Sequence, residues 1–279
     1  MQKEIKCAAL DLDGTVLQKD SRMSERTRLA LKKAAENRIE IVVVSGRSFA
    51  TIPEEIRHLE QIRYIVTSNG AAVYEKGIRI HDWTLEEQSV EKVLDLTGHL
   101  FQQGRITYEI FVKGEAYGQK DYLNAPERYG LPEHSCFYVK NTRWPTEDIV
   151  GFALEHKREL DSINLIVADP ELYKKLRQML EYDKKIYITS AASYRMEISH
   201  WDSGKISGLG YVLKRLGILP EETIAFGDGD NDAAMLKWVG VGVAMDNGTR
   251  MCKEAADLVT VSSSEDGVAR ILEQICAKE

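Results

Sequence analysis

Short apolar runs without polar alternation recur along this chain, and this pattern constrains its fold more than any other feature. Ile5 to Leu10, Ile39 to Val44 and Tyr64 to Thr67 each end in small or polar residues, and helical patterns lie between them. Strands of this kind are buried on both faces, as in a parallel sheet that helices cover. Similar runs occur at 223–226, 239–245 and 258–261. The sequence therefore predicts an α/β fold, a Rossmann-like doubly wound parallel sheet.

Helix boundaries and one hairpin can also be read from the sequence. Ser24 is an N-cap for a helix that continues to about residue 35. A second helix is expected over Lys205 to Leu216, where Gly217 would end it. The apolar segments 72–74 and 78–80 flank Glu75-Lys76-Gly77 and predict a β-hairpin.

The middle of the chain has a different character. From about Trp83 to Ser199, charged and aromatic residues are denser and the predicted strands alternate, with helices near 86–102, 146–157 and 170–181. We therefore expect an α/β core formed by residues 1–82 and 200–279, interrupted by an inserted α+β domain at 83–199. The two crossings, near 82–84 and 199–202, are candidate hinges for opening and closing.

Composition limits the partners of this chain. Its 37 Lys and Arg residues against 44 Asp and Glu give a net charge of −7, which argues against nucleic acid as a partner. No apolar run approaches the ~18 residues of a membrane span, so we expect no membrane insertion. The first strand follows Met1 closely, which leaves no room for a signal peptide and makes a cytoplasmic location the expectation. The four scattered cysteines are expected to be reduced thiols.

The residues after the first strand, Asp11-Leu12-Asp13-Gly14-Thr15, point to phosphoryl transfer. Open α/β sheets place their ligands at the carboxyl ends of the strands. Asp11 would be held there as a nucleophile, and Asp13 would pass a proton to a leaving oxygen. Asp, Gly and Thr are also ordinary turn formers, so these five residues alone do not decide the function.

Two further strand or helix ends would suit a phosphate group. Ser45 and Gly46 follow the second strand, where a hydroxyl and backbone N–H groups would hold phosphate oxygens. The alternative is that Ser45 only caps a helix beginning near Ser48. Lys205 stands at a helix start, which is unfavourable for a cation but useful beside a bound anion. A solvated lysine is the simpler alternative there.

Crowded carboxylates follow the strand at 223–226. The segment Gly227-Asp228-Gly229-Asp230-Asn231-Asp232 opens a helix carrying Met235, Leu236 and Trp238 on its apolar side. Such carboxylates repel one another without a cation, and their hard oxygens suit Mg²⁺. An EF-hand loop is excluded because Ala233 and Val239 stand where it needs Gly and Glu. A dinucleotide-binding loop lacks its third Gly, and a Walker A loop lacks its first.

Taken together, these segments resemble the haloacid dehalogenase-like superfamily, and more narrowly its Cof-type sugar-phosphatase branch. The resemblance rests on Asp11-x-Asp13-Gly14-Thr15, Ser45-Gly46-Arg47, Lys205 and Gly227-Asp228-x-x-Asn231-Asp232, and extends to 68–71, 242–245 and 265–269. It implies a large α+β cap for the inserted domain. Asp246 is a departure, because the family usually has Gly there, and the geometry of that loop is in question.

The resemblance assigns a role to each matching residue. It makes Asp11 the nucleophile and Asp13 the general acid and base, with Mg²⁺ held by Asp11, the backbone carbonyl of Asp13, and Asp228. Ser45, Gly46, Lys205 and Asn231 would bind the phosphate. Asp232 would support Lys205 or a metal-bound water, and Asp230 would be a solvated carboxylate.

The resulting hypothesis is Mg²⁺-dependent hydrolysis of a small phosphomonoester, with a sugar phosphate as the expected metabolite. A dehalogenase on this scaffold would not need Asp13, and P-type ATPases carry Thr at that position. A phosphomutase of the phosphomannomutase type remains an alternative, since it uses the same two aspartates. A non-catalytic phospholigand sensor is a third reading. The inserted domain is expected to choose the substrate, but no residue pattern there identifies the substrate or the oligomeric state.

Overall fold

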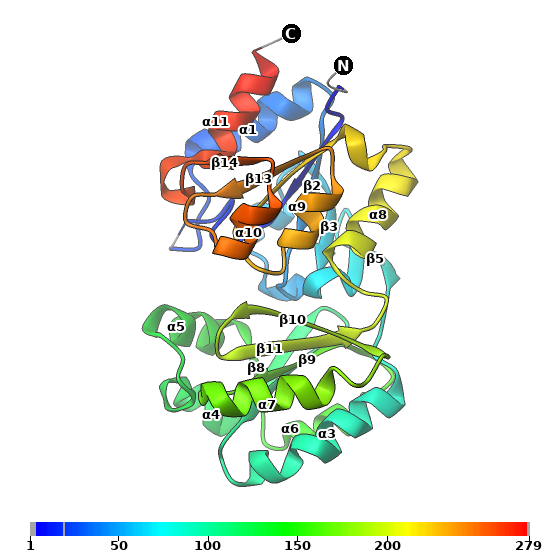
Figure 1. Ribbon diagram of the computed structural model, residues 1–279, viewed down its shortest axis with the longest axis vertical. Helices are drawn as coiled ribbons and strands as arrows, with labels where there is room; N and C mark the ends of the chain where they lie inside the picture. The colour runs from blue at the N-terminus through cyan, green and yellow to red at the C-terminus, as the bar shows by residue number, and fades with distance from the viewer. Residues whose placement is uncertain (1–3, 19, 278–279) are drawn as a thin grey trace. The chain divides into compact units, whose positions relative to one another are not determined.

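A computed structural model describes residues 4–18 and 20–277 of the chain (Figure 1). Contacts divide it into two compact units. The described part of the first unit covers 4–18, 20–46, 52–81 and 204–277, and the second covers 47–51 and 82–203. No helix in the described ranges is long and apolar enough to cross a membrane.

The first unit is built on an eight-stranded sheet in the order β14-β13-β12-β1-β2-β3-β4-β5. All neighbours from β14 to β3 are parallel, and β3 pairs with β4 in antiparallel fashion. The strands are β1 (Cys7–Leu10), β2 (Glu40–Val44), β3 (Ile62–Thr67), β4 (Ala72–Glu75), β5 (Ile78–Asp82), β12 (Thr223–Gly227), β13 (Val241–Met245) and β14 (Leu258–Thr260). β1 is fully buried between β12 and β2, which confirms the predicted α/β class with a parallel core sheet.

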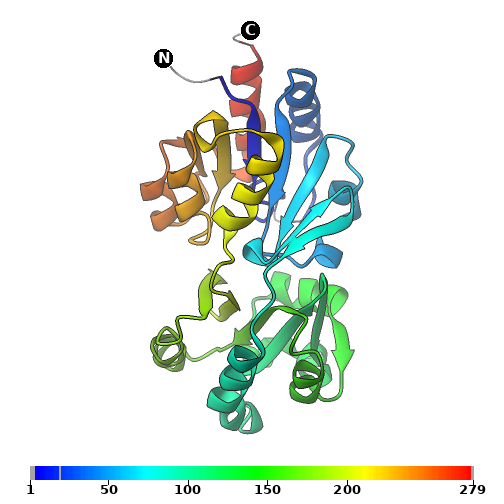
Figure 2. The same ribbon diagram turned by 90° about the vertical axis from the view of Figure 1, so that its right-hand side faces the viewer.

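Helices cover both faces of this sheet. α1 packs against α11, while α8 packs against α9 and α9 against α10, and Figures 1 and 2 show these two groups on opposite faces. Right-handed crossovers require this arrangement, since the strand order runs in opposite directions on the two sides of β1. The helices are α1 (Glu25–Glu36), α2 (Glu54–Arg57), α8 (Lys205–Leu216), α9 (Ala233–Trp238), α10 (Arg250–Ala255) and α11 (Gly267–Cys276).

The second unit holds a six-stranded sheet in the order β10-β11-β9-β6-β7-β8. Tyr108, Ile110, Ile163 and Leu165 belong to the buried apolar core of this unit, together with residues of α3, α6 and α7. The strands are β6 (Thr107–Val112), β7 (Glu115–Gln119), β8 (Trp144–Thr146), β9 (Leu160–Ile166), β10 (Ile186–Ala192) and β11 (Arg195–His200). The helices are α3 (Glu87–Gln102), α4 (Lys120–Asn124), α5 (Glu133–Thr142), α6 (Ile149–Glu155) and α7 (Pro170–Leu180).

Most expected elements form, with shifted ends. α8 has the predicted bounds, and Gly217 ends it in the left-handed region at φ 70°. Ser24 caps α1, where its hydroxyl accepts from the backbone N–H of Thr27. The helix expected near Ser48 is only a 3₁₀ turn, Phe49–Thr51. All four cysteines are buried free thiols, as expected.

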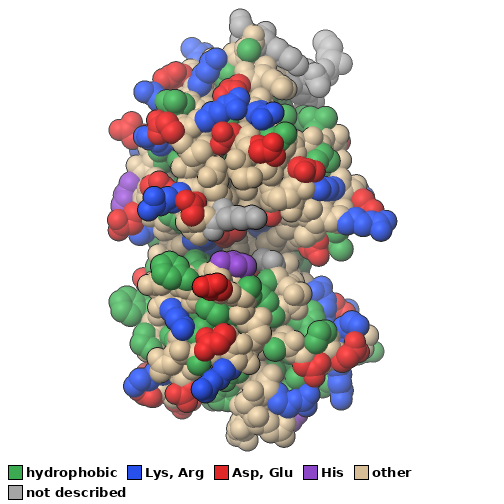
Figure 3. All heavy atoms as spheres, turned by 90° about the vertical axis from the view of Figure 1, so that its left-hand side faces the viewer, with side chains coloured by type: hydrophobic (Ala, Val, Ile, Leu, Met, Phe, Trp, Pro, Cys, Tyr) green, Lys and Arg blue, Asp and Glu red, His purple; other side chains and the backbone are tan. Residues whose placement is uncertain are grey.

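The surface carries charges of both signs. In the view of Figure 3, Lys and Arg side chains are interspersed with Asp and Glu side chains over the first unit. Many of them form ion pairs, such as Lys6 with Glu222 and Arg26 with Glu273. Such exposed pairs contribute little to stability, in the range of ~0–1 kcal/mol each.

Candidate active site

Asp11 stands at the end of β1, where the central strand meets its neighbour β12. Its backbone N–H donates to the carbonyl of Phe226 at 3.1 Å, so the chain is still held in the sheet at this residue. The side chain is only 9% exposed. Asp13 lies two residues further on and is exposed. The nucleophile candidate is therefore rigid and buried, whereas the proton-transfer candidate is accessible to solvent.

The turn after Asp11 fits closely against the end of β12. Gly14 has φ 76°, and a Cβ at this position would lie 2.2 Å from Asp228 Oδ2. Thr15 Oγ1 donates to Asp228 Oδ1 at 3.3 Å. Position 14 requires glycine, because only glycine accommodates both the backbone angle and the nearby carboxylate of Asp228.

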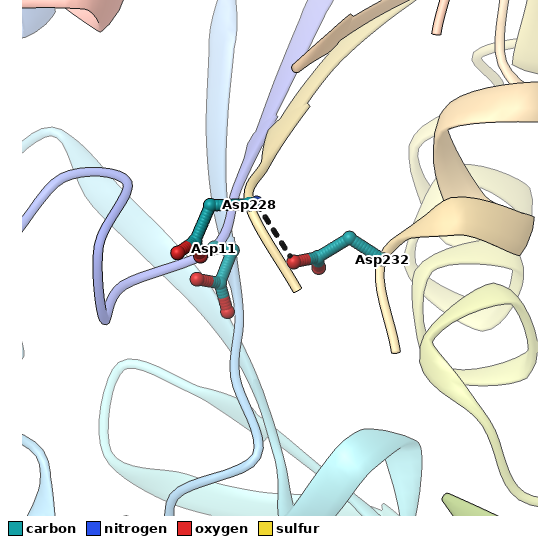
Figure 4. Close-up of side chains that lie close together, drawn as sticks. All are labelled: Asp11, Asp228 and Asp232. Carbon is teal, nitrogen blue, oxygen red and sulfur yellow. Dashed lines mark hydrogen bonds between the residues drawn. The ribbon is translucent and has the colours of Figure 1, made fainter. Parts of the chain in front are cut away.

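Asp232 folds back onto the same strand end. Its Oδ2 accepts hydrogen bonds from the backbone N–H groups of Asp228, at 3.1 Å, and Gly229, at 2.9 Å. Figure 4 shows the first of these bonds and the carboxylates of Asp11, Asp228 and Asp232 gathered together. Asp230 points to solvent, which agrees with its predicted role as a solvated carboxylate.

Lys205, the first residue of α8, connects two of these carboxylates. Its Nζ lies 2.6 Å from Asp11 Oδ1 and 2.6 Å from Asp232 Oδ1, and the side chain is 2% exposed. A buried ammonium is tolerated only when it is paired, and here two carboxylates supply the pairing. The simpler alternative of a solvated lysine is therefore wrong.

Burial and crowding shift the pKa values of these groups. Burial raises the pKa of Asp11 well above its usual value; Lys205 opposes this shift, while Asp232 and Asp228 add to it. Burial, together with Asp232, raises the pKa of Asp228 to about 7. For Lys205, burial favours the neutral form, but Asp11 and Asp232 outweigh it and raise its pKa. The site thus has more negative charge than its single lysine neutralises.

This donor set fits a divalent cation. Oxygen atoms of Asp11, Asp228 and Asp232 all lie within 4.8 Å of one another. Asp232 already bonds to Lys205 and to two backbone N–H groups, so Asp11 and Asp228 are the carboxylates best placed to hold an ion. Carboxylate oxygens are the ligands that Mg²⁺ takes in proteins, and a cation would relieve the repulsion that raises the pKa of Asp228.

The predicted phosphate-binding residues come from three different elements of the first unit. Ser45 follows β2 and is buried, and its backbone N–H donates to Val66 O at 2.9 Å. Asn231 lies in the loop before α9. Its side chain packs against Gly229, where an added Cβ would lie 2.4 Å from Asn231 Oδ1. Lys205 is the first residue of α8.

Two asparagines at this site were not among the predicted site residues. Asn69 Oδ1 accepts from Asn231 Nδ2 at 2.9 Å. Asn247 Nδ2 donates to the carbonyl of Gly14 at 2.8 Å and to Asp228 Oδ2 at 3.3 Å. Both follow the ends of core strands, β3 and β13, and this position is the signal that would have identified them. The unusual Asp246 is exposed and pairs with Lys253 at 3.3 Å.

Comparisons with known proteins agree with this geometry. A family model of haloacid dehalogenase-like hydrolases matches residues 8–272. The chain therefore belongs to the haloacid dehalogenase-like hydrolase family.

Its relatives are more specific. The chain is 26% identical to the 5-amino-6-(5-phospho-D-ribitylamino)uracil phosphatase YcsE of Bacillus subtilis, over 96% of this chain and 95% of that protein. It is 27% identical to phosphatase YwpJ of the same organism, over 97% and 100% of the two chains. A solved haloacid dehalogenase-like hydrolase from B. subtilis has a TM-score of 0.81 at 25% identity, covering 96% of this chain and 99% of that one. These findings confirm the predicted Cof-type branch and the enzyme class, a phosphatase.

Proposed function

We propose that this protein is a Mg²⁺-dependent phosphatase that hydrolyses small phosphomonoesters through a phosphorylated Asp11. The observation that carries the proposal is the placement of Asp11. Its carboxylate is buried at the end of the central strand, 2.6 Å from Lys205 Nζ and close to Asp228. A carboxylate held in this way is oriented for attack on a phosphorus atom while a cation and an ammonium lower the negative charge around it.

In the first step, a carboxylate oxygen of Asp11 forms a bond to phosphorus, and the bond from phosphorus to the ester oxygen breaks. Asp13 gives its proton to that oxygen, so the alcohol leaves neutral. Ser45, Gly46, Lys205 and Asn231 hold the transferred phosphoryl oxygens. Mg²⁺ bound by Asp11, the backbone carbonyl of Asp13, and Asp228 would neutralise charge so that a carboxylate can approach an anion.

In the second step, Asp13 takes a proton from water, and the water oxygen attacks phosphorus. The bond between phosphorus and Asp11 breaks, which releases inorganic phosphate and regenerates both carboxyl groups in their starting states. The exposure of Asp13 supports this role, since the same group must face a leaving alcohol and then water.

For the substrate we infer a phosphorylated sugar or sugar alcohol. Three similar B. subtilis proteins, 26% to 28% identical, are named as phosphatases of 5-amino-6-(5-phospho-D-ribitylamino)uracil, whose phosphate is on a ribityl chain. We assign substrate choice to the inserted domain at 83–199, as a cap. The alcohol part of a phosphomonoester differs between substrates while the phosphate does not, so a separate domain is suited to recognising it.

A panel of phosphomonoesters tests the function. Hexose phosphates, pentose phosphates, nucleotides, pyridoxal phosphate and the phosphoribitylaminouracil are assayed for phosphate release with Mg²⁺ and with a chelator. We expect release from at least one sugar phosphate, loss of activity with the chelator, and recovery when Mg²⁺ is restored. Turnover that is indifferent to the chelator, or no turnover of any member, contradicts the proposal.

A further inference from the structure

The turn between β3 and β4 has an unusual backbone. Ser68, Asn69 and Gly70 have φ values of 50°, 53° and 94°, three consecutive residues in the left-handed region. Such a conformation costs about 1 kcal/mol or more for each non-glycine residue, and it persists only where the surroundings enforce it. All three residues are buried. The contacts of this turn indicate what the strain maintains.

Asn69 touches the loop after β2 through its backbone and its side chain. Its N–H donates to the carbonyl of Ser45 at 3.0 Å. A Cβ at Gly46 would lie 3.1 Å from Asn69 Oδ1, so the side-chain amide is packed against that glycine. The N–H of Ser45 also donates to the carbonyl of Val66. Both backbone polar groups of Ser45, a residue predicted to bind phosphate, are therefore held by hydrogen bonds.

The same side chain reaches a second loop. Asn69 Oδ1 accepts from Nδ2 of Asn231, 162 positions away in sequence, at 2.9 Å. An amide nitrogen carries two hydrogens, so the one given to Asn69 orients the group and leaves a second for a phosphate oxygen. Without this acceptor, Asn231 would be free to rotate about its side-chain bonds.

The next residue of the turn contacts the segment before Lys205. A Cβ at Gly70 would lie 1.9 Å from the carbonyl oxygen of Gly204, so the two backbones approach as closely as glycine allows. Gly204 is the residue that precedes Lys205 and α8. Asn69 and Gly70 thus touch the segments that carry all four predicted phosphate-binding residues.

We propose that Asn69 is a positioning residue for the phosphate site, which orients Asn231 and holds the Ser45-Gly46 loop. This inference rests on the proposed function. Asn suits both demands of the position: it enters the left-handed region more readily than most residues, and it offers a neutral acceptor. Asp would place another negative charge beside the bound phosphate, and Gly would accept the backbone but lack the acceptor.

The substitution Asn69→Gly separates this role from a structural one. Glycine relieves the strained φ but removes a buried amide that accepts a hydrogen bond, so a merely structural role predicts a lower Tm with unchanged kinetics. Lys76→Gly is the matched control, because Lys76 has φ 49° and is exposed in the turn between β4 and β5. We expect both variants to fold: Lys76→Gly should retain or raise Tm, and Asn69→Gly should change Tm by the balance of relieved strain and the lost hydrogen bond. Only Asn69→Gly should lose kcat/KM and affinity for inorganic phosphate, by about 10- to 100-fold.

A double-mutant cycle with Asn231→Ala completes the test. If Asn69 acts through Asn231, Asn69→Gly should cost much less in the Asn231→Ala background than in the wild-type protein. Full additivity, or an Asn69→Gly variant with wild-type kcat/KM and phosphate inhibition, overturns the positioning role. A wild-type protein that releases no phosphate from any phosphomonoester instead counts against the proposed function, so the two failures are distinguishable.

Discussion

At the scale of single residues, the site is an unbalanced cluster of charge. Asp11, Asp228 and Asp232 lie within reach of one cation, and Lys205 is the ammonium that bridges Asp11 and Asp232. Desolvation penalises each carboxylate, and their mutual repulsion adds to it. The cluster therefore lowers the stability of the metal-free protein, and the binding of a divalent ion would raise that stability again.

This imbalance predicts the pH dependence of stability. The carboxyl of Asp228 has a pKa of about 7 in the folded protein against an ordinary 3.8. Between these two pH values, the folded state holds a proton that the unfolded state has released. The stabilising effect of that proton is complete below the ordinary pKa and is lost as the pH rises to about 7. With a chelator present, Tm should fall from pH ~5 to ~8, and the gain in Tm from Mg²⁺ should grow over the same range.

Asp228→Asn provides the comparison for that measurement. The variant has no carboxyl to titrate at this position, so its metal-free Tm should fall less with pH than that of the wild-type protein. Burial also raises the pKa of Asp11, but Asp11 is present in both proteins, so the difference between the two curves reports on Asp228. Parallel Tm curves for the two proteins, with equal gains from Mg²⁺, would show that Asp228 neither titrates here nor holds the ion.

At the scale of elements, the loops at strand ends carry the chemistry, and close backbone packing sets their shape. Gly14 is the clearest case, since its absent Cβ leaves room for Asp228. Gly14→Ala should displace that carboxylate and raise the Mg²⁺ concentration for half-maximal activity by about 10-fold.

Gly104→Ala is the control for the backbone cost of that change. Gly104 has φ 68°, similar to the 76° of Gly14, but a Cβ there meets no atom within 4 Å. Both alanine variants should lose thermal stability for the same conformational reason, and only Gly14→Ala should change the Mg²⁺ dependence. An unchanged Mg²⁺ dependence in both variants would show that Asp228 does not hold the metal ion.

Local signals account for the elements that were predicted well. Ser24 caps α1 and Gly217 ends α8 through contacts within a few residues, which a sequence pattern can show. α5 was not predicted; it follows Pro132 and buries only Cys136 and Val139, so its apolar periodicity is weak. The expected helix near Ser48 is only a 3₁₀ turn that ends two residues before Pro53, because proline disfavours the α conformation for the residue that precedes it.

In the candidate site, too, residues with a local sequence signal were predicted and residues that depend on distant contacts were not. Asp11, Lys205, Asp228 and Asp232 were predicted because each follows a strand or opens a helix, and the structure brings them together. Asn69 and Asn247 were not assigned roles, because their contacts cross 162 and 233 positions of sequence and depend on strand order. No local pattern indicates that β1 lies between β12 and β2.

At the scale of the whole molecule, family membership covers residues 8–272, and the relatives match over nearly their full lengths. The two units differ in architecture: a mostly parallel sheet covered on both faces in the first, and a mostly antiparallel sheet in the second. All residues proposed for chemistry lie in the first unit. The cap at 83–199 stays a prediction, as does its part in choosing the substrate.

The central claim is that Asp11 carries the phosphoryl group during turnover. It is tested by mixing the protein with Mg²⁺ and a substrate from the panel, quenching early with borohydride, and sequencing the peptides by mass spectrometry. Borohydride reduces an acyl phosphate to an alcohol, so our account predicts homoserine at position 11, dependent on substrate and absent in Asp11→Asn. Phosphate release with an unmodified Asp11, or with homoserine at another aspartate, would contradict it.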